Sequence, residues 1–150
     1  MKTLFSIFFL LFTTTLALAQ DSFEQAVYHS EGDSLQYRIQ YPLNYDQTKK
    51  YPLVLFLHGA GERGSDNQSQ LTHGSALFAN PGMRNAFPAI VIFPQCPKDS
   101  YWANVDVDRS NYPIGITFHP DQKPTPHLKM AGELVSSFIE EGKVDTSRVY

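Results

Sequence analysis

The chain has 150 residues, of which 42% are apolar and 18% are charged, so it is long enough for one domain with a core and too apolar for a disordered chain. Its 12 Lys and Arg residues against 15 Asp and Glu residues give a net charge of -3 at pH 7. Because no basic run is available to neutralise phosphates, we expect no binding to nucleic acid.

Residues 1–19 have the composition of a secretory signal peptide. Lys2 supplies a positive charge, an apolar run follows over residues 4–18, and residues 17–19 (ALA) offer the small residues of a signal-peptidase site. The alternative is an uncleaved membrane anchor, but the run is short for a spanning helix and contains three threonines. We therefore expect a mature chain of residues 20–150 in the periplasm or outside the cell, with no membrane span.

Cys96 is the only cysteine, so the chain cannot form an internal disulfide. It follows an apolar run, and we expect it to be buried as a small hydrophobic side chain rather than to act as a nucleophile.

The first predicted elements are strands. Residues 23–30 and 34–42 alternate apolar and polar side chains around Gly32-Asp33, which predicts an antiparallel hairpin with one solvent-exposed face. Residues 53–57 (LVLFL) and 89–93 (AIVIF) are apolar throughout, which predicts interior strands that are covered on both faces.

The segments after these strands differ in periodicity. Residues 69–80 show modest helical periodicity, and Pro81-Gly82 is expected to close that helix. Residues 99–126 are rich in Tyr, Trp, Asn, Asp and Pro and have no periodicity. We expect a long loop there that borders a functional site.

The C-terminal part contains the clearest helix. Thr125-Pro126 matches an N-cap followed by proline at the first helical position, apolar residues recur at spacings of three and four up to residue 139, and Gly142 stands where a C-cap belongs. Residues 144–150 (VDTSRVY) predict a turn followed by the first residues of another strand. The order of elements predicts an α/β fold in which a hairpin is followed by alternating strands and helices of a mostly parallel sheet.

The segment at residues 53–64, LVLFLHGAGERG, carries the chemistry. A strand of a parallel sheet that ends in a Gly-rich turn presents backbone N–H groups at the carboxyl edge of the sheet, and Gly59 and Gly61 let a ligand approach the main chain. Fixed N–H groups of this kind stabilise an oxyanion, so the turn indicates acyl transfer. For His58 we favour a neutral imidazole that braces the turn over a catalytic base.

The segments LVLFLHGAGERGSDN and AIVIFPQCP, together with Trp102 and the final VDTSRVY, resemble the N-terminal half of an α/β-hydrolase. The similar group is that of the secreted esterases, which includes polyhydroxybutyrate depolymerase-like and feruloyl esterase-like enzymes and is related to the dienelactone hydrolase and prolyl oligopeptidase families. The resemblance covers residues 23–150. It implies an α/β-hydrolase-like fold and a serine hydrolase for small-molecule or polymeric esters, and we expect no cofactor and no metal.

The resemblance also implies roles for residues of the turn. Ala60 is the expected N–H donor of the oxyanion hole, with Gly61 as its neighbour and His58 and Gly59 as support. Glu62 and Arg63 match an acidic-basic pair of the family. We expect an internal ion pair that shapes the turn, and a direct substrate contact of Arg63 is the alternative.

Three further residues match the family pattern. Asp66 and Asn67 correspond to a helix entrance, where they are expected to cap. Trp102 either lines the substrate cleft or covers the core.

The sequence departs from the family in one respect. The strand that begins at residues 148–150 should lead into a nucleophile elbow, Gly-x-Ser-x-Gly, but no such motif occurs in the 150 residues. Ser75 follows His73-Gly74, yet Leu77 stands where the second glycine belongs. We expect the elbow and the Ser-His-Asp triad to follow residue 150, so that the 150-residue chain alone is inactive.

Three further histidines give no catalytic or metal signature. His73, His119 and His127 are tied by spacing to no acid or nucleophile, and neither H-x-x-x-H nor H-E-x-x-H is present. We interpret them as exposed polar residues.

Two hypotheses follow. The first is the N-terminal part of an exported serine esterase. The second is a non-catalytic secreted module on a degraded hydrolase fold, which would bind carbohydrate or another partner through Tyr101, Trp102 and Tyr112 of the loop at residues 101–118. Within the first hypothesis, an esterase and a peptidase are alternatives.

Overall fold

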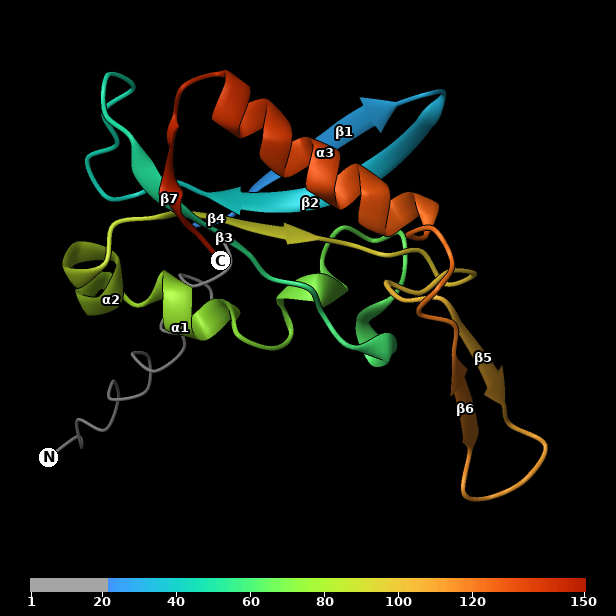
Figure 1. Cartoon of the computed structure of the whole chain (residues 1–150). Helices are drawn as coiled ribbons and strands as arrows, with labels where there is room; N and C mark the ends of the chain where they lie inside the picture. The colour runs from blue at the N-terminus through green and yellow to red at the C-terminus, as the bar shows by residue number, and fades with distance from the viewer. Residues whose placement is uncertain (1–21) are drawn as a thin grey trace, which may run out of the picture.

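The computed structural model describes residues 22–150, so the predicted signal peptide lies outside the described residues. The described part contains a mixed five-stranded sheet and a separate two-stranded hairpin (Figure 1). The sheet has the order β1-β2-β4-β3-β7, with strands at Glu24–Ser30 (β1), Asp33–Gln40 (β2), Tyr51–Leu55 (β3), Ile90–Pro94 (β4) and Val144–Val149 (β7).

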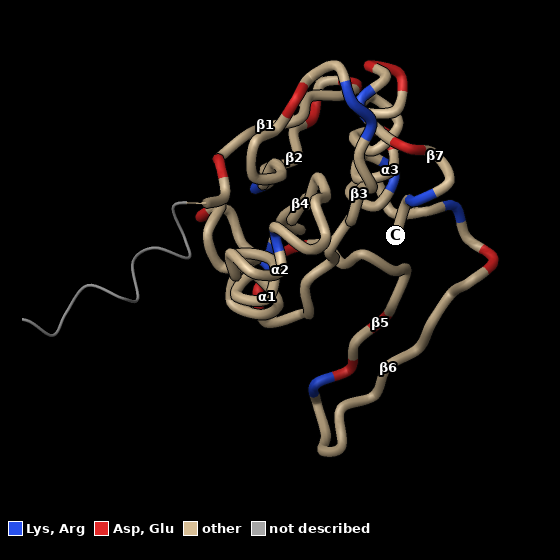
Figure 2. The backbone as a smooth tube through the Cα atoms, turned by 90° about the vertical axis from the view of Figure 1, so that its left-hand side faces the viewer, with Lys and Arg blue, Asp and Glu red and all other residues tan. Residues whose placement is uncertain are grey.

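Helices cover both faces of this sheet (Figure 1). The long helix α3 (Pro126–Glu140) lies on one face, and the other face carries the short helices η2 (Ser69–Leu71), α1 (Ser75–Ala79) and α2 (Pro81–Ala86). Figure 2 shows Lys and Arg residues interspersed with Asp and Glu residues along the chain. No helix in the described part of the chain has the length and apolar character needed to cross a bilayer.

The continuous apolar run of β4 is explained by these two layers. Ile90 and Ile92 belong to the core under α3, whereas Val91 and Phe93 belong to the core on the side of η2 and α1. All five residues of β4 are buried. The interior strand predicted over residues 89–93 is thereby confirmed, and β3 is likewise interior, with parallel partners β4 and β7 on its two sides.

The predicted N-terminal hairpin is also present, but its polar face is partly covered. β1 and β2 pair in antiparallel register from Glu24↔Ile39 to Ser30↔Asp33. Arg38 and Gln40 were expected on the exposed face, yet they are only 7% and 2% exposed. The physical reason for Arg38 is that its guanidinium donates to the carbonyl oxygens of Asn67 and Phe23.

Helix α3 follows the prediction closely. The Thr125 hydroxyl accepts a hydrogen bond from the Leu128 N–H, Pro126 occupies the first helical position, and Gly142 takes a φ of 75° just past the end. Three residues of the predicted stripe, Ala131, Leu134 and Phe138, are buried together with Met130, whereas Leu128, Val135 and Ile139 of that stripe are partly buried.

The single helix predicted over residues 69–80 is wrong. The segment is divided into η2 and α1, because Gly74 adopts a φ of 82° that an α-helix cannot contain. Pro81-Gly82 does not end the helical region as expected. Pro81 instead starts α2, where the Asn80 side chain accepts a hydrogen bond from the Met83 N–H.

The expectation of an irregular loop over residues 99–126 is also wrong in part. Residues Val105–Asp108 (β5) and Gly115–Phe118 (β6) form an antiparallel hairpin inside it. This hairpin projects from the rest of the chain (Figures 1 and 2), and all four residues of β6 are exposed.

Candidate functional site

The candidate site is the turn at residues 58–63, at the carboxyl end of β3. Because β3 pairs in parallel with β4 and β7, the carboxyl ends of all three strands meet at one edge of the sheet. After Gly59, whose backbone is extended at φ -77° and ψ 178°, the chain forms one turn of 3-10 helix, η1 (Ala60–Glu62). Gly59, Ala60 and Gly61 are exposed there.

His58 is buried beneath this turn and is hydrogen-bonded at both ring nitrogens. Nε2 lies 3.0 Å from the backbone nitrogen of Cys96 and must accept its proton, so Nδ1 carries the ring proton and donates to the carbonyl of Gly59 at 2.7 Å. Burial lowers the pKa of His58 below its ordinary value. His58 is therefore a neutral imidazole that holds the turn through two hydrogen bonds, and neither nitrogen is free to act as a base.

The exposed N–H groups of the turn are the groups of this site that could bind a ligand. Among residues 22–150, the backbone N–H groups of Gly59, Ala60 and Gly61 meet no acceptor. Unpaired N–H groups held at a sheet edge can bind an anion or the developing oxyanion of acyl transfer. The two donors expected from the sequence, on Ala60 and Gly61, are both in this set.

The ion pair expected between Glu62 and Arg63 is wrong for the described residues. Adjacent side chains in a helical turn point in different directions. The Glu62 carboxylate lies 3.4 Å from Nε2 of His73 instead. Arg63 donates to three backbone carbonyls, those of Ala60 (2.9 Å), Lys98 (2.9 Å) and Ser100 (2.8 Å).

Tyr101 is held between two arginines. The guanidinium carbon of Arg63 lies 3.8 Å from the centre of the Tyr101 ring, and Arg109 donates to the Tyr101 hydroxyl at 3.2 Å. The hydrogen bond from Arg109 is the main reason that the pKa of Tyr101 falls below its ordinary value. One face of the ring is therefore occupied by protein.

Trp102 contacts both the turn and the core. Its Nε1–H donates to the carbonyl of His58 at 3.1 Å, and its ring packs against the buried cluster that includes Met130 and Ala131. Of the three aromatic residues expected to form a binding surface, Tyr101 and Trp102 are thus engaged. Only Tyr112 of these three stands free, with 95% of its surface exposed.

Gln95 is a site residue that the sequence analysis missed. It lies directly after β4 and is 2% exposed. Its Oε1 accepts the Asn67 N–H at 2.8 Å, and its Nε2 donates to Asp66 Oδ1 at 2.7 Å and to the Glu62 carbonyl at 3.2 Å. The sequence could have identified Gln95, because a residue directly after β4 lies at the same sheet edge as the turn.

Asp66 accepts N–H groups at the start of η2, as expected for a helix entrance, although Gln68 occupies the N-cap position, whereas Asn67 accepts none there. Asp66 Oδ1 accepts from the N–H groups of Gln68 and Ser69 at the start of η2, and the Ser69 hydroxyl bonds to Oδ2. These bonds, led by that of the Ser69 hydroxyl, hold the pKa of Asp66 far below its usual range. Asn67 is buried, and its Oδ1 accepts from Gln70 at 2.6 Å.

The other candidate residues lie in ordinary surroundings. Ser75 donates to the Leu71 carbonyl at the start of α1, so it is not on a strand-to-helix elbow. Cys96 is a buried free thiol, as expected. Within residues 22–150, no group of three or more His, Cys, Asp or Glu side chains could hold a metal ion.

His73, His119 and His127 each lie near an acidic or hydroxyl group, and His119 and His127 are half-buried rather than exposed as expected. His119 Nε2 lies 2.7 Å from an Asp106 carboxylate oxygen, and His127 Nδ1 lies 3.1 Å from the Ser100 hydroxyl. His73, which faces Glu62, is largely exposed.

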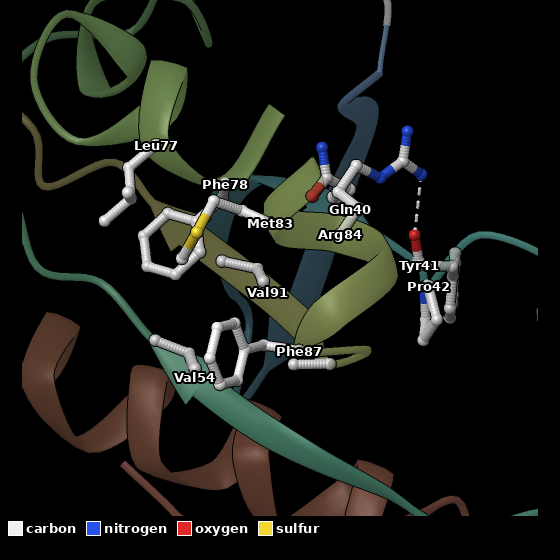
Figure 3. Close-up of a pocket in the computed structure, with 11 residues that line it drawn as sticks. Gln40, Tyr41, Pro42, Val54, Leu77, Phe78, Met83, Arg84, Phe87 and Val91 are labelled. Carbon is white, nitrogen blue, oxygen red and sulfur yellow. Dashed lines mark hydrogen bonds between the residues drawn. The ribbon is translucent and has the colours of Figure 1, made fainter. Parts of the chain in front are cut away.

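An apolar cavity of about 100 Å³ lies elsewhere, between the sheet and the short helices α1 and α2 (Figure 3). Val54 and Val91 line it from the strands, and Phe78, Met83 and Phe87 line it from the helices and the residue after them. Arg84 belongs to its rim, where its guanidinium points toward the carbonyl of Tyr41 (Figure 3) and donates to it at 2.8 Å. No residue of the turn lines this cavity.

The known proteins to which this chain is similar are hydrolases. The solved structure of a thermostable esterase matches with a TM-score of 0.73 and 32% sequence identity, over 89% of this chain and 34% of that one. The probable dipeptidyl-peptidase 5 of Aspergillus niger is 34% identical over 65 residues, which are 43% of this chain and 9% of the peptidase. A CE1 ferulic acid esterase from Anaeromyces mucronatus matches at a TM-score of 0.48 and 18% identity, over 85% of this chain and 47% of that one. No protein-family model matches.

This chain therefore spans only about a third of the thermostable esterase that it resembles, at 34% of that length. The match covers 89% of this chain. The mixed sheet with helices on both faces and this similarity show that the described residues form an α/β-hydrolase-like partial fold, similar to part of an esterase.

Proposed function

We propose that the protein is an exported carboxylic-ester hydrolase, an esterase or depolymerase, of which this chain is the N-terminal part. In this proposal the backbone N–H of Ala60, with that of Gly61 beside it, binds the negative oxygen that forms when a serine attacks the ester carbonyl. The observation that carries the proposal is the set of exposed N–H groups without acceptors in the turn after β3. The similarity to a thermostable esterase supports it.

The serine, histidine and acid of the triad are proposed to lie outside this chain. The serine hydroxyl gives its proton to the histidine as it attacks, and the alcohol leaves with that proton while an acyl-serine ester forms. Water then releases the acid by the reverse route. His58 is not that histidine, because both of its ring nitrogens are already hydrogen-bonded. A segment that continued β7 would enter the site beside the turn, since β7 pairs directly with β3.

Export and substrate class rest on the sequence. The signal-peptide pattern of residues 1–19 supports action in the periplasm or outside the cell, on small-molecule or polymeric esters. The net charge of -3 and the interspersed charges in Figure 2 argue against nucleic acid as a partner.

The test is a substitution that removes one N–H group and little else. Ala60→Pro deletes the expected donor, and the site tolerates proline because Ala60 begins η1 and the extended Gly59 before it suits a following proline. In the protein produced from its complete gene, we expect Ala60→Pro to lower kcat for p-nitrophenyl acetate by about a hundredfold to a thousandfold. Ala60→Ser, which keeps the N–H, should retain kcat. A wild-type protein that neither hydrolyses such esters nor reacts with a fluorophosphonate would refute the proposal.

A secreted binding module remains the second candidate, and one observation favours it. The β5–β6 hairpin exposes an apolar set without a catalytic role, which comprises Tyr112 (95%), Ile114 (48%), Ile116 (56%) and Phe118 (64%). If this surface is the functional one, the wild-type protein should bind an insoluble polysaccharide without hydrolysing esters, and Tyr112→Ala should abolish the binding.

A further inference from the structure

Three consecutive backbone carbonyls of the turn are each held by a different side chain. The His58 carbonyl accepts from Trp102 Nε1 at 3.1 Å, and the Gly59 carbonyl accepts from His58 Nδ1 at 2.7 Å. The Ala60 carbonyl accepts from Arg63 Nε at 2.9 Å. We infer that Trp102, His58 and Arg63 are positioning residues that set the direction of the three N–H groups of the turn. This inference rests on the proposed function of those N–H groups.

The physical link is the planarity of the peptide bond. In a trans peptide unit the carbonyl of one residue and the N–H of the next are coplanar and point in opposite directions. Holding the His58 carbonyl therefore orients the Gly59 N–H. In the same way, His58 orients the Ala60 N–H through the Gly59 carbonyl, and Arg63 orients the Gly61 N–H through the Ala60 carbonyl.

The backbone alone does not fix these peptide planes. Within the turn, the one main-chain hydrogen bond of the described structure runs from the Glu62 N–H to the Gly59 carbonyl, and it is long at 3.3 Å. Gly59 and Gly61 add conformational freedom at two of the three positions. Side-chain donors are thus required if the N–H groups are to keep one direction before a ligand arrives.

Each of the three positioning residues is itself anchored on a different part of the fold. The Trp102 carbonyl accepts from the Thr125 hydroxyl at the start of α3. His58 Nε2 accepts from the Cys96 N–H after β4. Arg63 reaches the carbonyls of Lys98 and Ser100 and stacks on Tyr101.

Such anchoring is what a preorganised site needs. Donors that are fixed before charge develops stabilise a transition state without reorganising at the moment of reaction. A direct substrate contact was one of the alternatives for Arg63 and for Trp102, and the inference replaces it with an action through the backbone. It also predicts a one-to-one map, in which each side chain controls one N–H vector.

The experiment measures that map directly. Glycine and alanine are labelled with 15N in the protein from the complete gene, and residual dipolar couplings of the turn amides are recorded. Arg63→Met should change the coupling of Gly61 and leave that of Gly59 unchanged, and Trp102→Phe should do the reverse. Arg63→Lys serves as a second variant if Arg63→Met fails to fold, since lysine cannot hold all three carbonyls.

The matched control is Arg84→Met. Arg84 also holds a backbone carbonyl, that of Tyr41 at 2.8 Å, but it lies away from the turn. It should change no coupling of the turn. The proposal is overturned if the couplings of Gly59, Ala60 and Gly61 are unaffected by the turn variants or change together in each of them.

Kinetics supply a second readout that a purely structural role would not reproduce. For p-nitrophenyl acetate we expect kcat to fall tenfold or more in Arg63→Met and Trp102→Phe with KM within about twofold, because the donors act in the transition state. Unchanged kcat with altered couplings would overturn the catalytic part of the inference. If the wild-type protein hydrolyses no ester but the coupling map holds, the proposed function fails while the control of the N–H directions by these side chains stands.

Discussion

His58 Nε2 accepts the backbone N–H of Cys96 at 3.0 Å, and this bond joins the ends of two neighbouring parallel strands. An imidazolium has a proton on both nitrogens and cannot accept. Protonation of His58 would therefore replace this hydrogen bond by a repulsive contact between its Nε2–H and the N–H of Cys96.

The stability of the protein should depend on the charge state of His58. Burial lowers the pKa of folded His58 below the ordinary value of 6.5, so the unfolded chain binds more protons between those two pKa values. The free energy of unfolding should be highest above pH 6.5, should fall as the pH drops below it, and should stop falling from this cause below the folded pKa. Urea unfolding from pH 7.5 to pH 5 measures the effect. In His58→Gln this part of the pH dependence should vanish, and parallel curves for the two proteins would contradict the assignment.

Replacement by leucine should affect the free energy of unfolding differently at Gln95 and at Gln36. Gln95→Leu removes three hydrogen bonds and leaves the Asn67 N–H buried without its acceptor, which should cost about 2–3 kcal/mol of unfolding free energy. Gln36 Oε1 is buried with no partner, so Gln36→Leu should change stability by less than about 0.5 kcal/mol or raise it. Chemical denaturation of both variants tests the pair. Equal losses would mean that the hydrogen bonds of Gln95 do not stabilise the fold.

Replacement by alanine should change stability in opposite directions at two glycines, Gly74 and Gly132. An added Cβ at Gly74 would lie 2.6 Å from the Phe56 ring, and Gly74 has a φ of 82°. Gly74→Ala should therefore cost about 2–4 kcal/mol. Gly132 lies in α3 with no atom within 4 Å of an added Cβ, so Gly132→Ala should stabilise by about 0.5–1 kcal/mol. Thermal unfolding of the two variants should shift the midpoint in opposite directions.

The projecting hairpin should contribute little to global stability. Phe93 is fully buried, and Phe93→Ala should cost about 3–5 kcal/mol. Phe118 in β6 is 64% exposed, and Phe118→Ala should cost less than about 0.5 kcal/mol. A large loss in Phe118→Ala, measured by denaturant titration, would show that the hairpin is packed against other parts of the protein in solution.

The elements that the sequence predicted correctly carry local signals. The residues that cap α3 directly adjoin the helix in sequence. The uninterrupted apolar run of β4 indicates directly that the strand is buried on both faces. The turn was found because its glycines follow such a run. In each case the information needed lies within a few residues of the feature.

The features that were missed depend on distant contacts or on single residues that interrupt a pattern. Gly74 divides a segment whose apolar residues show modest helical spacing on both sides of it. The strands of the β5–β6 hairpin are four residues each, too short for alternation to stand out among polar neighbours. Arg63 was paired with its neighbour in sequence, but its partners include carbonyls 35 and 37 residues away.

Cys96 gives the protein a built-in probe of its candidate site. Its thiol is the only one in the chain and is fully buried, and burial raises its pKa, so a thiol reagent can reach it only when the surrounding structure opens. Because the amide of the same residue holds His58, the opening that exposes the sulfur also releases the turn. The labelling rate of the native cysteine therefore reports how often the turn loosens, without any engineered tag.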